Sequence, residues 1–364
     1  YEYEKIESIT LSETSFKSEL EKITHERINI ENKLYDFKII YVGDKIGLYI
    51  KLHHLIADAW SVSLIISMLQ QILSQKDFQS GIPSYIEYIE SENRYIGSKK
   101  NIRDVEYWKS IFPEKPELVT FSPGKTSNTN ICAHRSIFDL SECESQPILK
   151  YCHDHELSLG ILFEAAASIY AARINQTNRV TLCSMVLNRN GYVEKNTIGM
   201  FSNILPLSVS IDSALPFHDL CLQIAQTHLE GFRHQKLPLH EIFKSWNSKD
   251  TSPIYDIMVS YQDMKANYDG IETIEWIFNG FSDLGYMFNI SNCEYDSIHV
   301  DVDWRVEQFS ELEAKDVFYR VLNIIKKGIS SDNISVRDIA IATDEEIHKI
   351  INSFNDTECP YSYS

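Results

Sequence analysis

Strand-like and helix-like segments alternate along both halves of this sequence. Apolar strands are expected around residues 37–42, 45–52, 131–140, 179–188, 204–211, 255–262 and 297–306. Helices, most with apolar residues at helical spacing, are expected around residues 61–73, 84–95, 103–112, 158–175, 216–235 and 311–329. Because each half contains both kinds of element, the sequence predicts an α/β protein with two sheet-containing lobes.

A polar stretch with three prolines, between residues 113 and 130, interrupts this periodic pattern. It predicts a flexible joint between an N-terminal lobe at residues 1–120 and a C-terminal lobe at residues 121–343. A chain of 364 residues is long enough for two such cores.

Charge and composition argue against several classes of binding partner. The net charge of -18 argues against a nucleic-acid backbone, whose binding needs concentrated Lys and Arg. No apolar stretch approaches the roughly 20 residues that span a bilayer, and the first residues lack the pattern of a signal peptide, so no membrane partner is expected. The seven cysteines form no C-x-x-C pair, which fits a reducing cytoplasm and indicates neither a disulfide framework nor a zinc site.

The segment YIKLHHLIADAWSVSLI, residues 49–65, places two histidines and an aspartate between a strand and a helix. Strand alternation puts His54 on one face with Ile50 and Leu52, which is expected to be buried, and His53 on the other. A lone histidine on an apolar face is more often a hydrogen-bonded core residue than a catalyst. The adjacent histidine and the carboxylate four residues later favour a functional site, because an imidazole is suited to proton transfer.

Another pair, His153 and His155, lacks the i, i+4 spacing of ligands on a helix and has no clear third ligand nearby. A solvated helix start is expected there, and no metal site is predicted.

Several segments together resemble the condensation domain of nonribosomal peptide synthetases, a family related to chloramphenicol acetyltransferase. HHLIADA resembles the HHxxxDG motif of the family, and DVEYWKSIF its tyrosine-tryptophan helix. NRNGYVEKNTIGMFSNILPL is similar to the segment with an asparagine-arginine pair and the IGMFxNxLPL signature. HQKLPLHEI and SPIYDIMVSYQD resemble two further motifs, and FNDTECPYS resembles the link into an adenylation domain. The resemblance covers nearly all of the chain, and it implies that the N-terminal segment of the family, with its first motif, is absent from the sequence.

The resemblance implies two acetyltransferase-like lobes in a V, with the active site in a central tunnel. Donor and acceptor peptidyl carrier proteins would dock at its two ends, each inserting a phosphopantetheine arm, so the domain itself would bind no cofactor. The acceptor amine would attack the donor thioester to form an amide. Residues 344–364 would be a linker toward an adjacent adenylation domain.

The resemblance also assigns the site residues. His54 would be the catalytic residue, either as a general base or by orienting the amine and stabilising the tetrahedral intermediate. His53 would be a structural neighbour, and Asp58 would pair with Arg189 of the second lobe, because an unpaired buried charge is costly. Ala59 stands where the family has a glycine, and it would be strained only if φ there is positive. The residues expected to line the substrate tunnel are Trp60, Ser61 and Asn203.

Three alternatives stay open at this point. An epimerization domain also carries HHxxxD, although the order of Trp60 and Ser61 is that of condensation domains. A catalytically inactive condensation-like domain could serve only as a docking platform, although such domains usually lose the histidine pair. A free-standing acyltransferase would use a diffusible thioester, and the adenylation-like tail argues against it.

Overall fold

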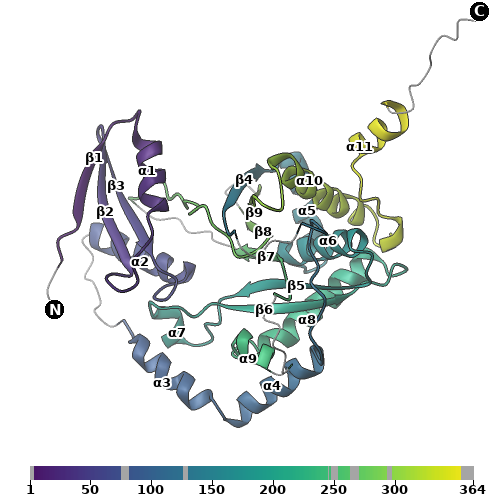
Figure 1. Cartoon of the computed structure of the whole chain (residues 1–364), viewed down its shortest axis with the longest axis horizontal. Helices are drawn as coiled ribbons and strands as arrows, with labels where there is room; N and C mark the ends of the chain where they lie inside the picture. Colours follow the sequence, from purple (N-terminus) through teal and green to yellow (C-terminus); the bar gives the residue numbers. More distant parts are fainter. Residues whose placement is uncertain are drawn as a thin grey trace, which may run out of the picture. The chain divides into compact units, whose positions relative to one another are not determined.

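The structure is a computed structural model that describes residues 4–74, 82–125, 130–244, 246, 253–262, 270–292 and 297–353. The chain divides into two compact units (Figure 1). Unit 1 comprises residues 1–106, 186–203 and 266–281, and unit 2 comprises residues 107–185, 204–265 and 282–364. The first boundary thus follows Glu106, ahead of the expected residue 120, and two later segments return to unit 1.

Residues 119–122, within the stretch expected to be a flexible joint, belong to the core of unit 2. Val119 is 3% exposed and Phe121 is 5% exposed, and both pack in the main hydrophobic cluster. The Thr120 hydroxyl accepts a hydrogen bond from the Ser122 N–H at 2.8 Å. The prediction of a joint is wrong at these residues because apolar side chains between the prolines anchor the segment.

Unit 1 is built on a three-stranded sheet in the order β1-β2-β3. β1 and β2 are parallel, and β2 and β3, both expected as strands, form an antiparallel hairpin with Gly43 at φ +60° in its turn. The elements with residues in this unit are β1 (Glu7–Leu11), α1 (Phe16–His25), β2 (Tyr35–Val42), β3 (Lys45–Leu52), α2 (Ala59–Leu73), α3 (Tyr85–Tyr95), α4 (Lys99–Ile111), which continues into unit 2, and α7 (Tyr192–Asn196).

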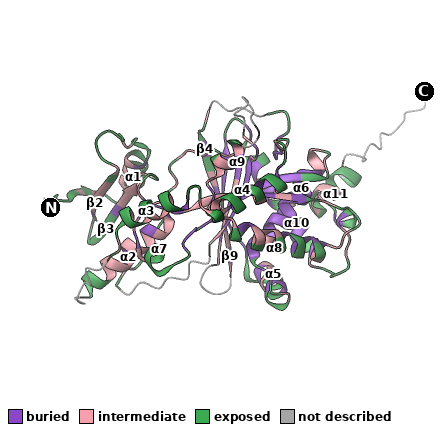
Figure 2. Cartoon of the chain, turned by 90° about the horizontal axis from the view of Figure 1, so that it is seen from below, coloured by how far each residue is buried: buried purple, intermediate pink, exposed green. Residues whose placement is uncertain are grey.

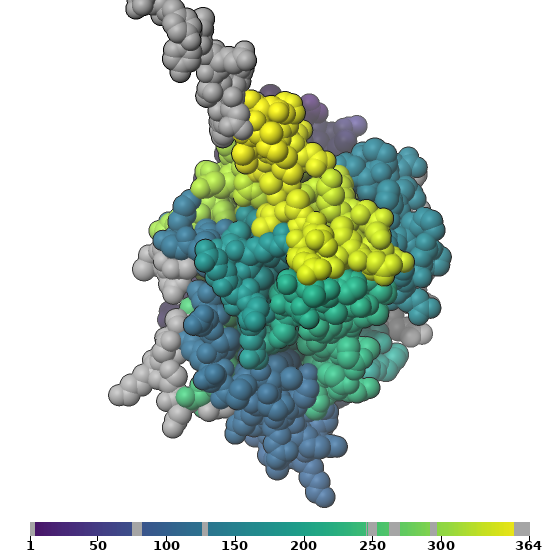
Figure 3. Space-filling model, turned by 90° about the vertical axis from the view of Figure 1, so that its right-hand side faces the viewer, coloured from purple at the N-terminus to yellow at the C-terminus, as the bar shows by residue number. Residues whose placement is uncertain are grey.

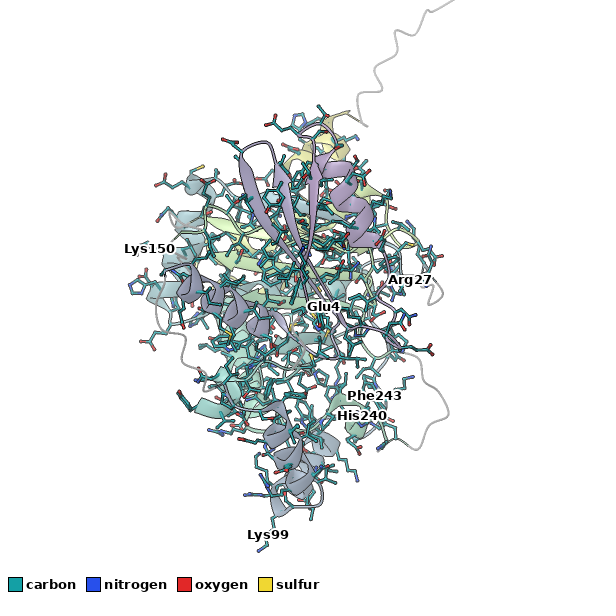
Figure 4. All side chains as sticks on the ribbon, turned by 90° about the vertical axis from the view of Figure 1, so that its left-hand side faces the viewer. Glu4, Arg27, Lys99, Lys150, His240 and Phe243 are labelled. Atoms are coloured by element: carbon teal, nitrogen blue, oxygen red, sulfur yellow. The ribbon has the colours of Figure 1, made fainter. Side chains whose placement is uncertain are left out.

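The helix α1, which the sequence pattern did not predict, lies beside the strands of this sheet (Figure 4). Tyr49 donates a hydrogen bond to Thr24, the buried residue of α1, and Lys51 donates to the Ile23 carbonyl at 2.9 Å. Tyr49 is accordingly 7% exposed, whereas Leu48, on the other face, is 40% exposed. Leu48 shares its face with Ile50, Leu52 and His54, so the expectation that this face is the buried one is wrong.

Unit 2 contains a six-stranded sheet in the order β4-β9-β8-β7-β5-β6. β7 lies parallel to both β5 and β8, and β9 is antiparallel to both β8 and β4. The further elements are β4 (Ala133–Asp139), α5 (Glu142–Asp154), α6 (Leu159–Ile174), β5 (Arg179–Val186), β6 (Asn203–Ser210), α8 (Phe217–Arg233), α9 (Leu239–Lys244), β7 (Ile257–Gln262), β8 (Tyr286–Asn292), β9 (Ile298–Arg305), α10 (Glu311–Gly328) and α11 (Asp344–His348).

The buried residues gather around the sheet and helices of unit 2 (Figure 2). The Ala-rich and Leu-rich helix α6 lies at its centre, where it contacts β7, α8 and α10 and has 13 buried residues among its 16. The strand series β7-β8-β9 repeats the arrangement of β1-β2-β3, a parallel pair followed by an antiparallel partner. Both units therefore mix strands and helices, which confirms the α/β class.

The segment after α10 packs against unit 2 (Figure 3). Arg173 of α6 donates to the carbonyls of Val336 and Ile339, and Arg320 of α10 forms an ion pair with Glu346 at 2.6 Å. The expected linker at residues 344–364 thus begins with residues that contact this unit, and residues 354–364 lie outside the described part of the chain.

Within the described ranges, no single helix is long and apolar enough to cross a membrane. Only α5 and α6 taken together pass that test, and they are bent by 105° at the break between them.

Candidate active site

The two histidines follow the end of β3, in a turn that leads to α2. β3 ends at Leu52, residues 54–56 form the turn, and α2 begins at Ala59. His53 is half-buried: its N–H donates to the Leu34 carbonyl at 2.8 Å, and its Nδ1 accepts from the Leu55 N–H at 3.1 Å. These contacts hold the turn and fit the expected structural role of His53.

His54 is exposed to solvent, not buried as the strand alternation implied. The reason is local, because the strand stops two residues earlier and the chain turns at His54. An exposed imidazole at a fixed turn is accessible to a molecule that brings a proton to it, which a general base requires.

Asp58 fixes the other end of this turn. It is the N-cap of α2, and its Oδ1 accepts hydrogen bonds from the Ser61 N–H at 2.9 Å and the Ser61 hydroxyl at 2.8 Å. Its Oδ2 accepts from the N–H groups of Phe201 at 3.1 Å and Ser202 at 3.3 Å. The Asp58 carboxylate therefore joins the N-terminus of α2 to residues 201–202, about 140 residues later in the chain.

Asp58 and Arg189, expected as a pair, lie together in unit 1. Arg189 Nη2 is 2.7 Å from Oδ1 and 2.9 Å from Oδ2 of Asp58, and the residues are 6% and 4% exposed. Burial raises the pKa of Asp58, but the Ser61 hydrogen bonds, the Arg189 charge and the Phe201 N–H outweigh it and lower the pKa below its usual value. Asp58 is thus ionised near neutral pH, but its lowered pKa makes it a weak base, and both of its oxygens are engaged in hydrogen bonds.

Arg189 also organises the segment in which it lies. Its Nη1 donates to the carbonyls of Glu194 and Thr197, and its Nη2 donates to the Gly199 carbonyl at 3.0 Å. The guanidinium lies 4.0 Å from the centre of the Phe201 ring, a cation–π contact. Arg189 was expected in the second lobe, but residues 186–203 belong to unit 1. The reason is that this segment, which connects β5 and β6, packs on α2 and on its N-cap Asp58.

The residues expected in a substrate tunnel differ in their surroundings. The Trp60 indole donates to the Lys195 carbonyl at 2.9 Å. Ser61 is fully buried, and its hydroxyl is in contact with Asp58, Arg189 and Gly199, which favours a structural role. Asn203 is half-buried at the start of β6.

Ala59, which replaces the glycine of the motif, is the first residue of α2 and does not have positive φ. The substitution is therefore unstrained. The residues with positive φ include Asn188 at +49°, immediately before Arg189, a conformation that asparagine tolerates better than most residues.

Two tyrosines of α3, Tyr85 and Tyr88, complete this site and were missed by the sequence analysis. Their rings lie 5.3 Å and 4.2 Å from the Phe201 ring, measured between centroids. The only signal for them is their spacing of three on a helix, which is as common in ordinary cores.

His153 is exposed near the end of α5, and His155 is the C-cap of that helix. The expected helix start is thus a helix end. In the described part of the chain, no group of three or more His, Cys, Asp and Glu side chains is placed to hold a metal ion.

Comparison with known proteins finds one matching family. A family model described as "Condensation domain" matches residues 2–351. The chain is 23% identical to surfactin synthase subunit 1 of Bacillus subtilis (strain 168) over 87% of its own length, and 22% identical to a dimodular nonribosomal peptide synthase of the same organism over 86%. It spans only 9% and 14% of those two relatives.

Solved structures show the same fold. The first condensation domain of the CDA synthetase matches with a TM-score of 0.80 at 15% identity, covering 93% of this chain and 78% of that one. The X-domain from teicoplanin biosynthesis matches with a TM-score of 0.81 at 13% identity, covering 93% and 81%.

Proposed function

Because the chain belongs to the condensation domain family, we propose that it forms an amide bond by acyl transfer between two carrier-bound substrates. The amine of an aminoacyl group on the acceptor carrier attacks the carbonyl carbon of the donor thioester. The C–N bond forms, the C–S bond breaks, and the donor arm leaves as a thiol that takes up the proton lost by the amine. The lengthened chain remains on the acceptor carrier.

The observation that carries this proposal is the exposed His54 on a turn fixed at both ends. His53 ties the turn to Leu34 at one end, and Asp58 ties it to residues 189–202 at the other. His54 either takes the proton of the attacking amine, a contribution of about 10²- to 10⁴-fold, or hydrogen-bonds the amine and the tetrahedral intermediate. Asp58 and Arg189 hold the turn and take no part in proton transfer.

The partners follow from the reaction. Donor and acceptor peptidyl carrier proteins supply the phosphopantetheine arms, and an adenylation domain adjoins the chain. Trp60 and Asn203 help to line the path by which the arms reach His54. The reaction takes place in the cytoplasm.

The test uses the full-length protein with carriers loaded by their own adenylation domains, followed by intact-protein mass spectrometry and chiral analysis of the released substrate. The expected result is that the acceptor carrier gains the mass of the donor acyl group. Inversion of configuration without mass transfer would show an epimerization domain. Carrier binding with neither change would show a docking platform, and either outcome would overturn the proposal.

A further inference from the structure

The beginning of α3 packs directly on the segment that holds Asp58. Tyr85 is the first residue of α3, and its hydroxyl donates to the Met200 carbonyl at 2.7 Å. Its ring occupies the space above Gly199, where a Cβ would lie only 2.1 Å from a ring carbon. Gly199 does not have positive φ, so the requirement for glycine here is one of space and not of backbone conformation.

This contact is continuous with the histidine turn. Residues 199–202 meet Tyr85 through Gly199 and Met200, and they meet α2 and its cap through the Gly199–Ser61 and Phe201–Asp58 hydrogen bonds. The Tyr85 ring also meets the Phe201 ring edge-on, at an interplanar angle of 85°. All of these residues belong to unit 1.

We propose that Tyr85 is a positioning residue for His54: by filling the space over Gly199 and bonding Met200, it holds residues 199–202 against Asp58 and so sets the place of the turn. The proposal rests on the proposed function, in which His54 must meet an amine at a defined position. Tyr85 acts through Asp58 and touches no reacting atom.

The chemistry of the Tyr85 side chain suits this role. Burial and the nearby Asp58 charge raise the pKa of its hydroxyl, so the group stays protonated at physiological pH and can donate to a carbonyl. Tyr85→Phe removes only this donor and leaves the ring over Gly199. It is therefore the variant that separates the hydrogen bond from the packing.

The first experiment compares Tyr85→Phe with the matched control Tyr192→Phe, at a tyrosine of the same unit that is 81% exposed. Tyr85→Phe should lower kcat for condensation about tenfold, because a displacement of reacting groups by about 1 Å costs up to 10²-fold. KM for both carriers should stay within about twofold. Equal kcat values for the two variants, with a native circular dichroism spectrum in each, would overturn the proposal.

A second experiment tests the packing by itself. Gly199→Ala places a methyl group against the Tyr85 ring and should lower kcat, and Tyr85→Ala should lower it as well. In the double variant the methyl group has room, so kcat should exceed the value expected from multiplying the two single effects. Purely multiplicative effects would show that ring and glycine do not act as a unit.

The two proposals fail in different ways. If the unsubstituted protein transfers no acyl group to the acceptor carrier, the proposed function itself is wrong. If His54→Ala is inactive but Tyr85→Phe and Tyr192→Phe are alike, His54 is catalytic and only the positioning role of Tyr85 is wrong.

Discussion

At the scale of single residues, Asp58 shows how a buried charge is stabilised beside the histidine turn. Both of its oxygens accept hydrogen bonds from backbone N–H groups, and Arg189 contacts both. A buried pair of this kind adds little net stability compared with apolar packing, but it defines one arrangement of its surroundings. Here that arrangement is the meeting of α2 with residues 186–203.

Asp58→Ala and Arg189→Ala should each destabilise the protein by about 3 to 5 kcal/mol, because each leaves one buried charge unpaired. The double variant should lose less than the sum of the two single losses. Urea unfolding of the four proteins gives the coupling free energy. Additive losses would contradict a pair that acts as a unit.

The motif resemblance anticipated the Asp58–Arg189 pair, but the helical spacing of Tyr85 and Tyr88 does not distinguish them from ordinary core residues. The role of Tyr85 depends on the close approach of its ring to Gly199, more than a hundred residues away, and a single sequence does not record such an approach. The exposure of His54 was also missed, since strand alternation says nothing about where a strand ends.

At the scale of elements, His299 lies where β9 pairs with β4, and its imidazole titrates between neutral and alkaline pH. His299 faces Asp139 in the strand register, and its ring nitrogens lie 2.6 Å from Asp139 Oδ1 and 3.1 Å from Asp301 Oδ1. Hydrogen bonds with Asp301 and Asp139 raise the pKa of His299 to about 9, against the opposing effect of burial.

The sign of the pH dependence follows from that raised pKa. The contribution of protonated His299 to stability should be fully present below the ordinary histidine pKa of about 6.5, and it should be lost as the pH rises through about 9. The difference in urea midpoint between the unsubstituted protein and His299→Asn should therefore shrink from pH 6 to pH 9.5. A difference that does not change with pH would contradict this assignment.

The elements that the sequence predicted well have strong apolar periodicity or a continuous apolar run, as in α6 and α10. Of the missed elements, which also include α5, α7, α9, α11 and β8, two have neither: α1 is mostly polar and buries only Thr24, and β1 is a five-residue strand with no buried residue. Both are stabilised by contacts with β2 and β3, which a local pattern does not contain.

At the scale of the whole molecule, the α/β class was predictable and the division into units was not. Periodicity identifies strands and helices but does not say which unit a connecting segment joins. Residues 186–203 lie between two strands of the unit 2 sheet in sequence, yet the Arg189 and Phe201 contacts hold them in unit 1. Buried contacts at Val119 and Phe121 likewise place a proline-containing stretch inside a core.

The central claim is that His54 serves the chemistry of condensation, and rate and binding measured on one variant test it most directly. In His54→Ala, transfer between two loaded carriers should fall by about 10² to 10⁴, while the Kd for each carrier stays within a few-fold. His153→Ala, at an exposed histidine of α5, serves as the matched control and should keep the full rate. A His54→Ala protein that turns over at half the parental rate would contradict the account.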